Sequence, residues 1–294
     1  MNNKNQVKAW LYLLPSIILL LVFTILPFIW VIRYSLLNDF SFATREYNGI
    51  GFSNYTNLFK EGSEFLDAFS NTMIAIVIAV PVSLLISLSI AIAMNNIKVL
   101  QKFFRTIFFL PFATNAIAIG YVIMIIFLKN DHAVGLFNWF IGLFGVESID
   151  FINGPYIARM SLYIGYIVWR LIPFQIIIII SALHAIKREY YVAARIDGLS
   201  RVKQFNKITV PLLAPVLLFL IISGFIIVFK DFDNAISIFG DGRYMDTNFT
   251  TLSGFIYNGL KDNTGIASAA TVISLVIVVI VTVGLNIVRK AKER

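Results

Sequence analysis

Long apolar runs alternate with short polar segments along this chain of 294 residues. Five runs contain no Asp, Glu, Lys or Arg, and they are Ala9 to Ile32, Ala68 to Ile97, Thr106 to Leu128, Ile208 to Phe229 and Asn263 to Val288. Each is long enough to cross a hydrocarbon core of roughly 30 Å, which takes about 20 helical residues. A sixth run, Ile157 to Leu183, includes Arg159 and Arg170. The pattern predicts an all-α, polytopic membrane protein whose six transmembrane helices form a single domain over residues 1–294.

The composition agrees with this class and argues against several enzyme classes. Hydrophobic residues make up 59% of the chain and charged residues 14%, a balance unlike that of soluble domains. The first run is too long for a signal-peptide core and has no small-residue cleavage pattern, so we expect a retained helix. There is no Cys, and the two histidines, His132 and His184, are far apart. Disulfides, metal sites and redox chemistry are therefore disfavoured.

The positive charges predict the orientation in the membrane, because Lys and Arg are enriched in cytoplasmic segments. Fifteen of the 24 Lys and Arg fall on one side if the N-terminus is inside, and only six fall on the other. The acids show the opposite bias, since 13 of the 16 lie on the outer side. Both termini are predicted to be cytoplasmic. The net charge of +8 then reflects topology, and nucleic acid is not expected as a partner.

The outer segments, 38–67, 129–156 and 231–262, are too short to be domains and are rich in Gly, Asn and Asp. Within the second, Val134 to Gly145 is apolar but only about 12 residues long. That length suits an interfacial or re-entrant helix better than a seventh crossing.

The largest inner segment, His184 to Pro215, predicts a helix-turn-helix beneath the membrane. Its first half, Ile186 to Ile196, has helix-forming residues and reaches Asp197-Gly198, where glycine ends a helix by taking a positive φ. Ser200 then caps a second short helix in which Val202, Phe205 and Ile208 recur every three residues, and Pro211 opens the next span. Two interpretations stay open from pattern alone: a basic, amphipathic loop resting on anionic lipid, or a surface that docks a protein.

The residues of this segment resemble a known family. Ala193-Ala194, Asp197-Gly198, Phe205, Ile208, Pro211 and Pro215 are similar to the EAA loop of binding-protein-dependent ABC transporter permeases, with most likeness to their carbohydrate-uptake branch. The motif is specific, since eight positions are fixed over 23 residues. The chain departs from it at Val192, where the family has the Glu that names the motif, and Glu189 is the alternative acid for the ion pair with an ATPase.

Other segments extend the resemblance over nearly the full length. They are Gly51-Phe52-Ser53-Asn54-Tyr55, Leu58-Phe59, Asn71-Thr72, Leu110-Pro111, Trp169 with Pro173-Phe174, Phe232-Asp233 and Gly265-Ile266-Ala267-Ser268-Ala269. The resemblance implies the type I ABC importer permease fold in a bacterial cytoplasmic (inner) membrane, with segment 184–211 as the coupling loop. It also implies a second permease, a cytoplasmic ATPase dimer, an extracellular solute-binding protein and a sugar or oligosaccharide substrate.

ATP and Mg²⁺ are expected on the partner ATPase, and no cofactor is expected on this chain. No Gly-x-x-x-x-Gly-Lys-[Ser/Thr] loop occurs in the sequence, so nucleotide is not bound in that way. Catalytic residues are not expected either. The residues that the resemblance assigns to ATPase docking are Glu189, Ala193, Ala194, Asp197, Gly198, Phe205, Ile208 and Pro211.

A substrate path is suggested by position. Arg170 stands near mid-membrane, where a charge is costly unless it faces water, a partner or a ligand. Helical spacing places it on one face with Ile167, Leu171 and Phe174, and by resemblance to the maltose-type permeases a second face carries Gly224, Ile227, Val228 and Asp231. Phe174 would cover the C–H side of a sugar and Asp231 would bind hydroxyls, while helix packing is the alternative for the aliphatic positions. Arg170 also suggests an anionic sugar, or a structural role beside an acid.

Two other functional classes were weighed. An ion-coupled carrier without an ATPase would usually place acidic or His relays within its spans, and Arg170 is the only clear mid-span ionisable group. A membrane-embedded enzyme would need a cluster of His, Asp, Glu or Ser at membrane depth, and no such cluster is visible. The sequence therefore favours an importer permease.

Overall fold

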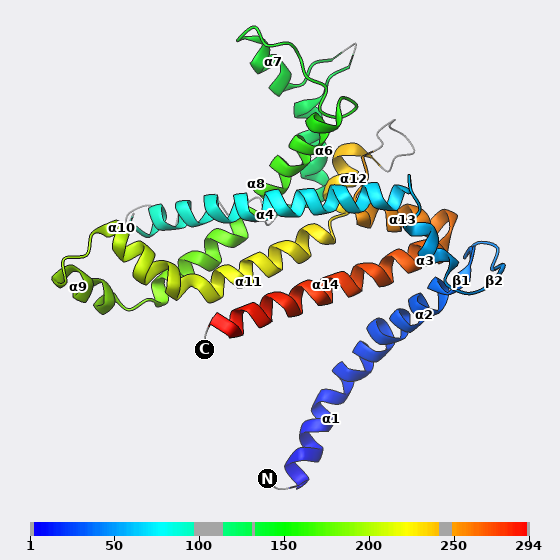
Figure 1. The fold of residues 1–294 in the computed structure, drawn as a ribbon, viewed down its shortest axis with the longest axis horizontal. Coiled ribbons are helices and arrows are strands. Elements are labelled where there is room, and N and C mark those ends of the chain that lie inside the picture. The colour runs from blue at the N-terminus through cyan, green and yellow to red at the C-terminus, as the bar shows by residue number, and fades with distance from the viewer. Residues whose placement is uncertain (1–2, 97–113, 131–132, 241–248, 293–294) are drawn as a thin grey trace. The chain divides into compact units, whose positions relative to one another are not determined.

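The computed structural model describes residues 3–96, 114–130, 133–240 and 249–292, and these are predominantly helical. The chain divides into two compact units, one formed by residues 1–66 and 255–279 and the other by residues 67–254 and 280–294. The sequence-based prediction of one domain over 1–294 stays a prediction. Figure 1 shows the course of the chain from the N-terminal helix to the C-terminal one.

Five of the described helices are long and apolar enough to cross a membrane: Trp10–Ser35, Glu64–Asn95, Tyr156–Ala185, Arg201–Phe229 and Thr264–Ile287. They coincide with five of the six runs predicted from hydropathy, which confirms a multi-pass, all-α membrane protein. The sixth predicted run, Thr106 to Leu128, is described only in part, as α6 (Ala116–Phe127). Its first residues lie outside the described part of the chain, as do Leu110 and Pro111.

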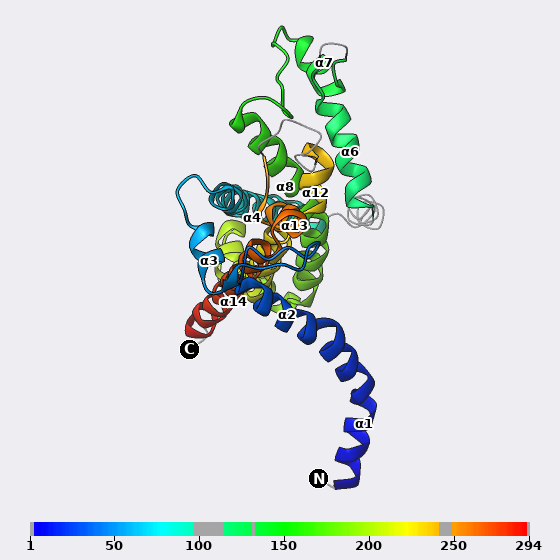
Figure 2. The same cartoon turned by 90° about the vertical axis from the view of Figure 1, so that its right-hand side faces the viewer.

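The first unit contains the N-terminal helix (Figure 2) and a small hairpin (Figure 1). Its elements are α1 (Asn3–Leu20), the π-helical turn η1 (Leu21–Ile25), α2 (Leu26–Ser35), β1 (Leu37–Asn38), β2 (Gly49–Ile50), α3 (Ser53–Leu58), and the adjoining parts of α4 (Glu64–Asn96), α13 (Leu252–Asp262) and α14 (Thr264–Lys292). The two strands are antiparallel, with Leu37 opposite Ile50 and Asn38 opposite Gly49.

Asn54 and Gly265 both contact the backbone around β1 and help to hold the hairpin in place. The buried Asn54 side chain donates hydrogen bonds to the carbonyls of Ser35 and Leu37, at 3.0 and 2.8 Å. Gly265 lies so close that a Cβ there would be 2.6 Å from the Leu37 carbonyl oxygen, and its N–H donates to the carbonyl of Phe40 at 3.0 Å. Asn54 and Gly265 are thus packing and capping residues, because a side chain at Gly265 has no room and the carbonyls near Asn54 need donors.

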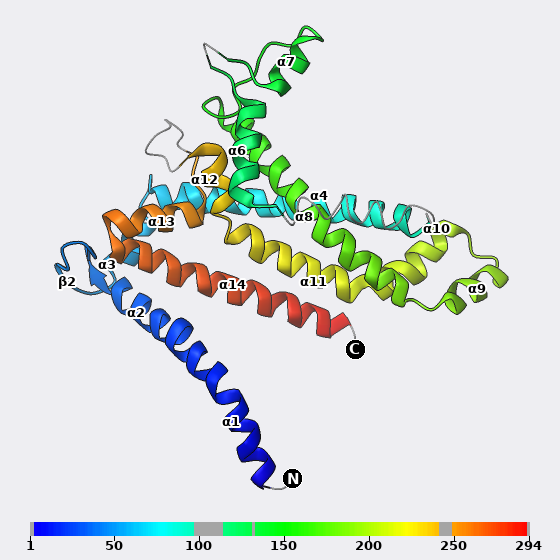
Figure 3. The same ribbon diagram turned by 180° about the vertical axis from the view of Figure 1, so that it is seen from behind.

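The second unit is built around three long helices. It contains most of α4, then α6, α7 (Leu136–Gly142), α8 (Tyr156–Ala185), α9 (Arg188–Ile196), α10 (Arg201–Gln204), the π-helical turn η2 (Phe205–Thr209), α11 (Val210–Phe229) and α12 (Asp233–Phe239). A cluster of buried side chains from α4, α8 and α11 joins these helices near the ends that flank α9 and α10, and its members are Ala91, Met94, Ile176, Ile179, Ile180, Leu183, Leu213 and Leu220. Figure 3 shows α9 and α10 beyond those ends.

Three short helices, α7, α12 and α13, lie outside the long membrane-spanning helices, and the sequence predicted only the first of them. Val134 to Gly145 was expected to contain a short helix, and α7 confirms it. The segment 231–262 was treated as an outer loop, but it contains α12 and α13. Both are short, and α12 carries buried polar residues such as Asn234 and Ser237, so hydropathy alone does not distinguish them from a loop.

Each π-helical turn ends two residues before a proline. Pro27 follows η1 and Pro211 follows η2, and the residue four positions before each proline lies inside the turn. A proline has no N–H, and its ring crowds that carbonyl in an ordinary α-helix. The wider π-turn moves the carbonyl away from the ring, so each helix continues through its proline.

Candidate docking loop and translocation path

The helix-turn-helix of segment 184–211 begins where α8 ends. Helix α9 is followed by Asp197 and by Gly198, whose φ is +75°. The N–H of Leu199 donates to the carbonyl of Ala194 at 2.9 Å, and the N–H of Gly198 donates to the carbonyl of Arg195 at 3.1 Å. This pair of bonds is the Schellman motif, which ends a helix at a glycine in the left-handed conformation. The predicted Gly198 helix stop is confirmed.

The second arm starts at Ser200, whose hydroxyl accepts a hydrogen bond from the Lys203 N–H at 3.4 Å, as the sequence predicted. One expectation was wrong. The segment from Ser200 to Pro211 was expected to be a separate short helix, with Pro211 opening the next span. Instead α10, η2 and α11 follow each other without a break from Arg201 to Phe229, because the π-turn accommodates Pro211.

The two arms of the loop are fastened to each other. The Tyr191 hydroxyl lies 2.9 Å from the Thr209 hydroxyl, and the Gln204 side-chain amide donates to the Leu199 carbonyl at 2.8 Å. Because α11 continues directly from the second arm, these bonds and the short turn connect α9 to a helix long enough to span a membrane.

The predicted docking residues occupy different environments on this loop. Ala194 is buried, Phe205 and Ile208 are half-buried, and Glu189, Ala193, Asp197, Gly198 and Pro211 are exposed. The docking residues predicted from the sequence did not include the apolar side chains that α9 and α10 expose most: Tyr190, Val192, Ile196 and Val202, of which Ile196 is 82% exposed. We refer to these four residues as the loop surface. Their helical alternation with buried Ala194 was the available signal.

The predicted path residues lie mainly inside the second unit. Five of the eight are buried there: Ile167, Leu171, Gly224, Val228 and Asp231. A Cβ on Gly224 would lie 3.1 Å from a Val80 methyl group, so α11 approaches α4 closely at this point. Arg170 and Phe174 are half-buried and Ile227 is exposed. The predicted two-faced path therefore stays a prediction, and in this conformation three of its members reach the surface of the unit.

Arg170 extends from α8 toward the segment that precedes α6. Its guanidinium donates a hydrogen bond to the Thr114 carbonyl at 3.3 Å. A carbonyl partner neutralises part of the cost of the charge at membrane depth.

Asp231 follows the last turn of α11, and its side chain is only 7% exposed. One carboxylate oxygen accepts a hydrogen bond from the Tyr163 hydroxyl on α8 at 2.7 Å, and the other accepts from the side-chain amide of Asn234 on α12. Burial raises the pKa of Asp231 to about 6, while these two hydrogen bonds oppose the rise. In this conformation both carboxylate oxygens of Asp231 therefore accept hydrogen bonds from side chains of the protein itself.

Further hydrogen bonds gather around the same ends of the helices. The Thr251 hydroxyl donates to the Asp231 carbonyl at 3.0 Å, and the Leu252 N–H donates to the Thr72 hydroxyl of α4 at 2.9 Å. The Asn71 side chain donates to the Thr250 carbonyl at 2.9 Å and accepts from the Tyr156 hydroxyl at 2.9 Å. We call the set Asn71, Thr72, Tyr156, Tyr163, Asp231, Asn234 and Thr251 the polar end network. It joins α4, α8, α11, α12 and the residues that lead into α13.

The sequence analysis did not predict a polar contact between α4 and α8 at membrane depth. Gln175 of α8 is 1% exposed; it accepts from the Ser87 hydroxyl of α4 at 2.9 Å and donates to the Ser83 hydroxyl at 3.0 Å. The spacing of Ser83 and Ser87, one helical turn apart, was the available signal.

Replacing Gln175 with Leu is expected to lower the free energy of unfolding by about 0.6 to 2 kcal/mol, because both interhelical bonds are lost in an apolar medium. Thermal unfolding of the purified protein in detergent measures the change. Ser89→Ala is the matched control, since the exposed Ser89 hydroxyl bonds only to the Leu85 carbonyl of its own helix. A Gln175→Leu protein as stable as the control would contradict an interhelical role.

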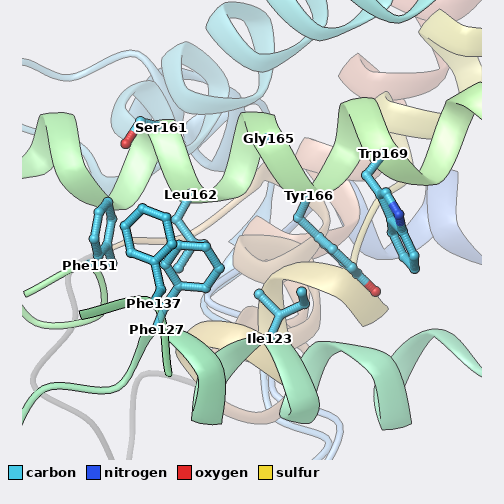
Figure 4. A pocket seen from close by; sticks show the side chains of 9 residues that line it. All are labelled: Ile123, Phe127, Phe137, Phe151, Ser161, Leu162, Gly165, Tyr166 and Trp169. Carbon is cyan, nitrogen blue, oxygen red and sulfur yellow. The ribbon is translucent and has the colours of Figure 1, made fainter. Parts of the chain in front are cut away.

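An apolar pocket of about 360 Å³ lies between α6 and α8 (Figure 4). Its lining residues are Ile123, Phe127, Phe137, Phe151, Ser161, Leu162, Gly165, Tyr166 and Trp169. Two of the hydroxyls are already used, since Tyr166 donates to the Ala116 carbonyl at 3.2 Å and Ser161 donates to the Ala158 carbonyl at 2.8 Å. A sugar needs several free polar partners, so the lining does not suit one.

No group of three or more His, Cys, Asp or Glu side chains in the described ranges is placed to bind a metal ion.

The described residues contain five helices long and apolar enough to cross a membrane, and an exposed helix-turn-helix lies between two of them. Residues 83–294 match the family of binding-protein-dependent transport system inner membrane components, and the chain belongs to this family. It is a multi-pass permease subunit.

Two relatives and one solved structure illustrate the similarity. The chain is 30% identical over 275 residues to the trehalose/maltose transport system permease protein MalF of Thermococcus litoralis, covering 94% of this chain and 91% of the relative. It is 33% identical over 280 residues to the lactose transport system permease protein LacF of Rhizobium radiobacter, covering 95% and 91%. The crystal structure of a bacterial ABC transporter involved in alginate import contains a chain with TM-score 0.77 and 20% identity, covering 98% of this chain and 96% of that one.

Proposed function

We propose that this chain is one permease subunit of an ATP-driven ABC importer, and that it forms, together with a second permease, the path for a sugar or oligosaccharide. Family membership over residues 83–294 supports the permease role. The names of two relatives, a trehalose/maltose permease and a lactose permease, support a sugar as the solute. The family does not favour the alternative of an ion-coupled carrier that works without an ATPase.

The observation that carries the proposal is the loop surface. Tyr190, Val192, Ile196 and Val202 are exposed on a short helix-turn-helix that continues directly into a membrane-spanning helix. Exposed apolar side chains on a rigid element suit docking of a folded protein. The docking partner is a cytoplasmic ATPase dimer that binds ATP and Mg²⁺, with Glu189, Ala193, Ala194, Asp197, Gly198, Phe205, Ile208 and Pro211 forming or supporting the contact.

The distribution of Lys and Arg along the chain supports an orientation of the subunit in the membrane. The Lys and Arg excess supports a cytoplasmic location for both termini and the coupling loop, and an extracellular solute-binding protein would then deliver the solute to the opposite end. Trp10, Tyr12 and Phe23 of the N-terminal helix are exposed, as expected for contact with lipid or with the second permease. The membrane is the bacterial cytoplasmic membrane.

Co-purification from the native membrane, followed by reconstitution, tests the proposal. We expect an ATPase, a second permease and a binding protein to accompany the chain. Proteoliposomes should take up sugar only when ATP, the ATPase and the binding protein are all present. Sugar uptake by the isolated chain in liposomes would overturn the proposal, and so would a coupling loop that is labelled from outside intact cells.

A second proposal concerns the solute's charge. Arg170 is half-buried at membrane depth in α8, where a cation attracts an anionic solute strongly because the local dielectric is low. Arg170→Gln is expected to reduce uptake of an anionic sugar, such as a uronic-acid oligosaccharide, at least about tenfold relative to a neutral one. Competition between charged and neutral sugars in proteoliposomes measures the ratio, and an unaltered ratio would remove the idea.

A further inference from the structure

Asp231 is a buried acid whose side-chain partners are neutral. Its carboxylate accepts hydrogen bonds from the Tyr163 hydroxyl and from the Asn234 amide, and the side chain is 7% exposed. Within the described part of the chain, no Lys or Arg forms an ion pair with it. A buried carboxylate without a cation is costly, and binding a proton removes that cost.

The neighbouring amide points to the same protonation state. The side-chain oxygen of Asn234 is buried and has no hydrogen-bond donor, although such orphaned acceptors are rare in folded proteins. The nitrogen and oxygen of an Asn amide exchange places when the amide rotates by half a turn. After that rotation the amide oxygen faces Asp231, and only a protonated carboxyl has an O–H to donate to it.

Asp231 lies where several helices meet, so a proton bound to its carboxylate affects how the ends of these helices pack. Asp231 ends α11, Tyr163 belongs to α8 and Asn234 belongs to α12, while Thr251 joins the Asp231 carbonyl to the segment that leads into α13. These elements lie at the end of α11 opposite to the coupling loop (Figure 1), which is about 30 Å away along a 20-residue helix. Under the proposed orientation, this end faces the exterior.

We propose that Asp231 is a proton-sensitive latch: its protonated form holds the external ends of α8, α11 and α12 together, and its ionised form releases them. The ionised carboxylate is stabilised by water, so it favours any conformation in which the polar end network opens to the outside. The protonated carboxyl is stable in the buried network, so external acid favours the arrangement seen here. The external location rests on the proposed function, whereas the packing of the network does not.

With the titratable and charged groups that lie near it, the Asp231 carboxyl gains or loses its proton within the range of external pH. From α8 the Tyr163 hydroxyl donates to the carboxylate, from α12 the exposed Asp233 adds a like charge, and Lys230, next in the chain, is exposed. Burial raises the pKa of Asp231 to about 6. Since this pKa lies above that of an exposed carboxyl, the closed network is favoured at low pH and loses stability as pH rises through about 6.

A single-cysteine experiment tests the latch. The chain contains no Cys, so Ala235→Cys on α12, at a site 7% exposed, supplies one reporter beside Asn234. The complete importer is placed in proteoliposomes with internal pH held constant, and a membrane-impermeant maleimide is added at external pH from about 5 to about 8. Labelling rates are divided by those of the denatured protein at each pH, which removes the titration of the thiol itself.

We expect the corrected labelling rate to rise at least roughly tenfold with a midpoint near pH 6, because a two-unit difference in pKa permits up to about a hundredfold change. Asp231→Asn keeps the shape of the protonated acid and supplies an amide N–H in place of its O–H donor, so its labelling should stay low at every pH. Asp233→Asn is the matched control, since this exposed neighbour loses the same charge, and it should retain the pH response. An unchanged pH response in Asp231→Asn would overturn the proposal.

Tyr163→Phe provides an independent test if Asp231→Asn fails to fold. The lost hydroxyl stabilises the ionised carboxylate, so the midpoint of labelling should move to higher pH. A midpoint that stays where it is would also overturn the latch. These results are distinguishable from failure of the proposed function, because labelling is read without ATP, sugar or transport.

Discussion

Replacing Gly198 with proline is expected to reduce solute-stimulated ATP hydrolysis and uptake to below about 1% of wild type, because the change costs about 3 kcal/mol or more. Gly198 has φ +75° and its N–H donates to the Arg195 carbonyl, whereas proline has φ near −65° and no N–H. The turn between the two arms of the coupling loop cannot form, so the loop surface loses its shape. ATPase activity and uptake of the reconstituted complex measure the effect.

Two other variants test the parts of this explanation separately. The first asks whether the turn needs glycine itself, and the second asks whether the apolar contact matters when the turn is intact. Gly198→Asn is expected to retain most activity, since Asn tolerates the left-handed conformation at a cost of about 1 kcal/mol or less. Phe205→Asp leaves the turn intact but places a charge on a half-buried apolar position of the second arm, and it should also abolish coupling. Normal coupling in both Gly198→Pro and Phe205→Asp would mean that the loop does not dock the ATPase.

Replacing Gly120 with valine is expected to prevent correct assembly of α6 on α12. A Cβ at Gly120 would lie 1.7 Å from the Ser237 hydroxyl oxygen and 2.4 Å from the Ser237 Cβ. Both residues are buried, so the two helices must separate to admit the side chain. Overpacking costs about 1 to 3 kcal/mol or more, a large part of the stability of a typical domain. Thermal unfolding and the yield of monodisperse protein in detergent measure the loss.

Gly142→Val is the matched control for this prediction. Nothing lies within 4 Å of a Cβ at Gly142, so the same substitution there tests helix propensity and added hydrophobicity without a clash. The Gly142→Val protein should unfold within a few degrees of wild type, as exposed substitutions usually do. Equal stability of the two variants would show that α6 and α12 do not pack through Gly120 in the membrane.

Sequence reasoning succeeded where a local pattern determines the structure. The membrane crossings follow from apolar length, and the helix stop at Gly198 and the cap at Ser200 follow from backbone chemistry within a few residues. It failed at η2, because the widening of the helix before Pro211 was taken for a break. It also missed α12, whose polar residues are buried by neighbouring elements that no local pattern reveals.

The candidate site divides in the same way. The docking residues were located from a motif, but the exposure of Ile196 and Val202 depends on how the two arms fold against each other. The resemblance to the maltose-type permeases placed Asp231 on a possible solute face. The structure places its carboxylate instead against Tyr163, 68 positions earlier in the chain, and spacing along one helix carries no information about such a partner.

The sequence by itself determined that this protein is a helical membrane protein and where the loop between α9 and α10 turns, since each depends on the transfer of nearby side chains or on backbone angles. Only the tertiary structure decided which polar groups meet: Gln175 with Ser83 and Ser87, Asn54 with the carbonyls of Ser35 and Leu37, and Asp231 with Tyr163 and Asn234. The physical reason is that a buried polar group must find a partner, and that partner is supplied by packing between segments distant in the chain.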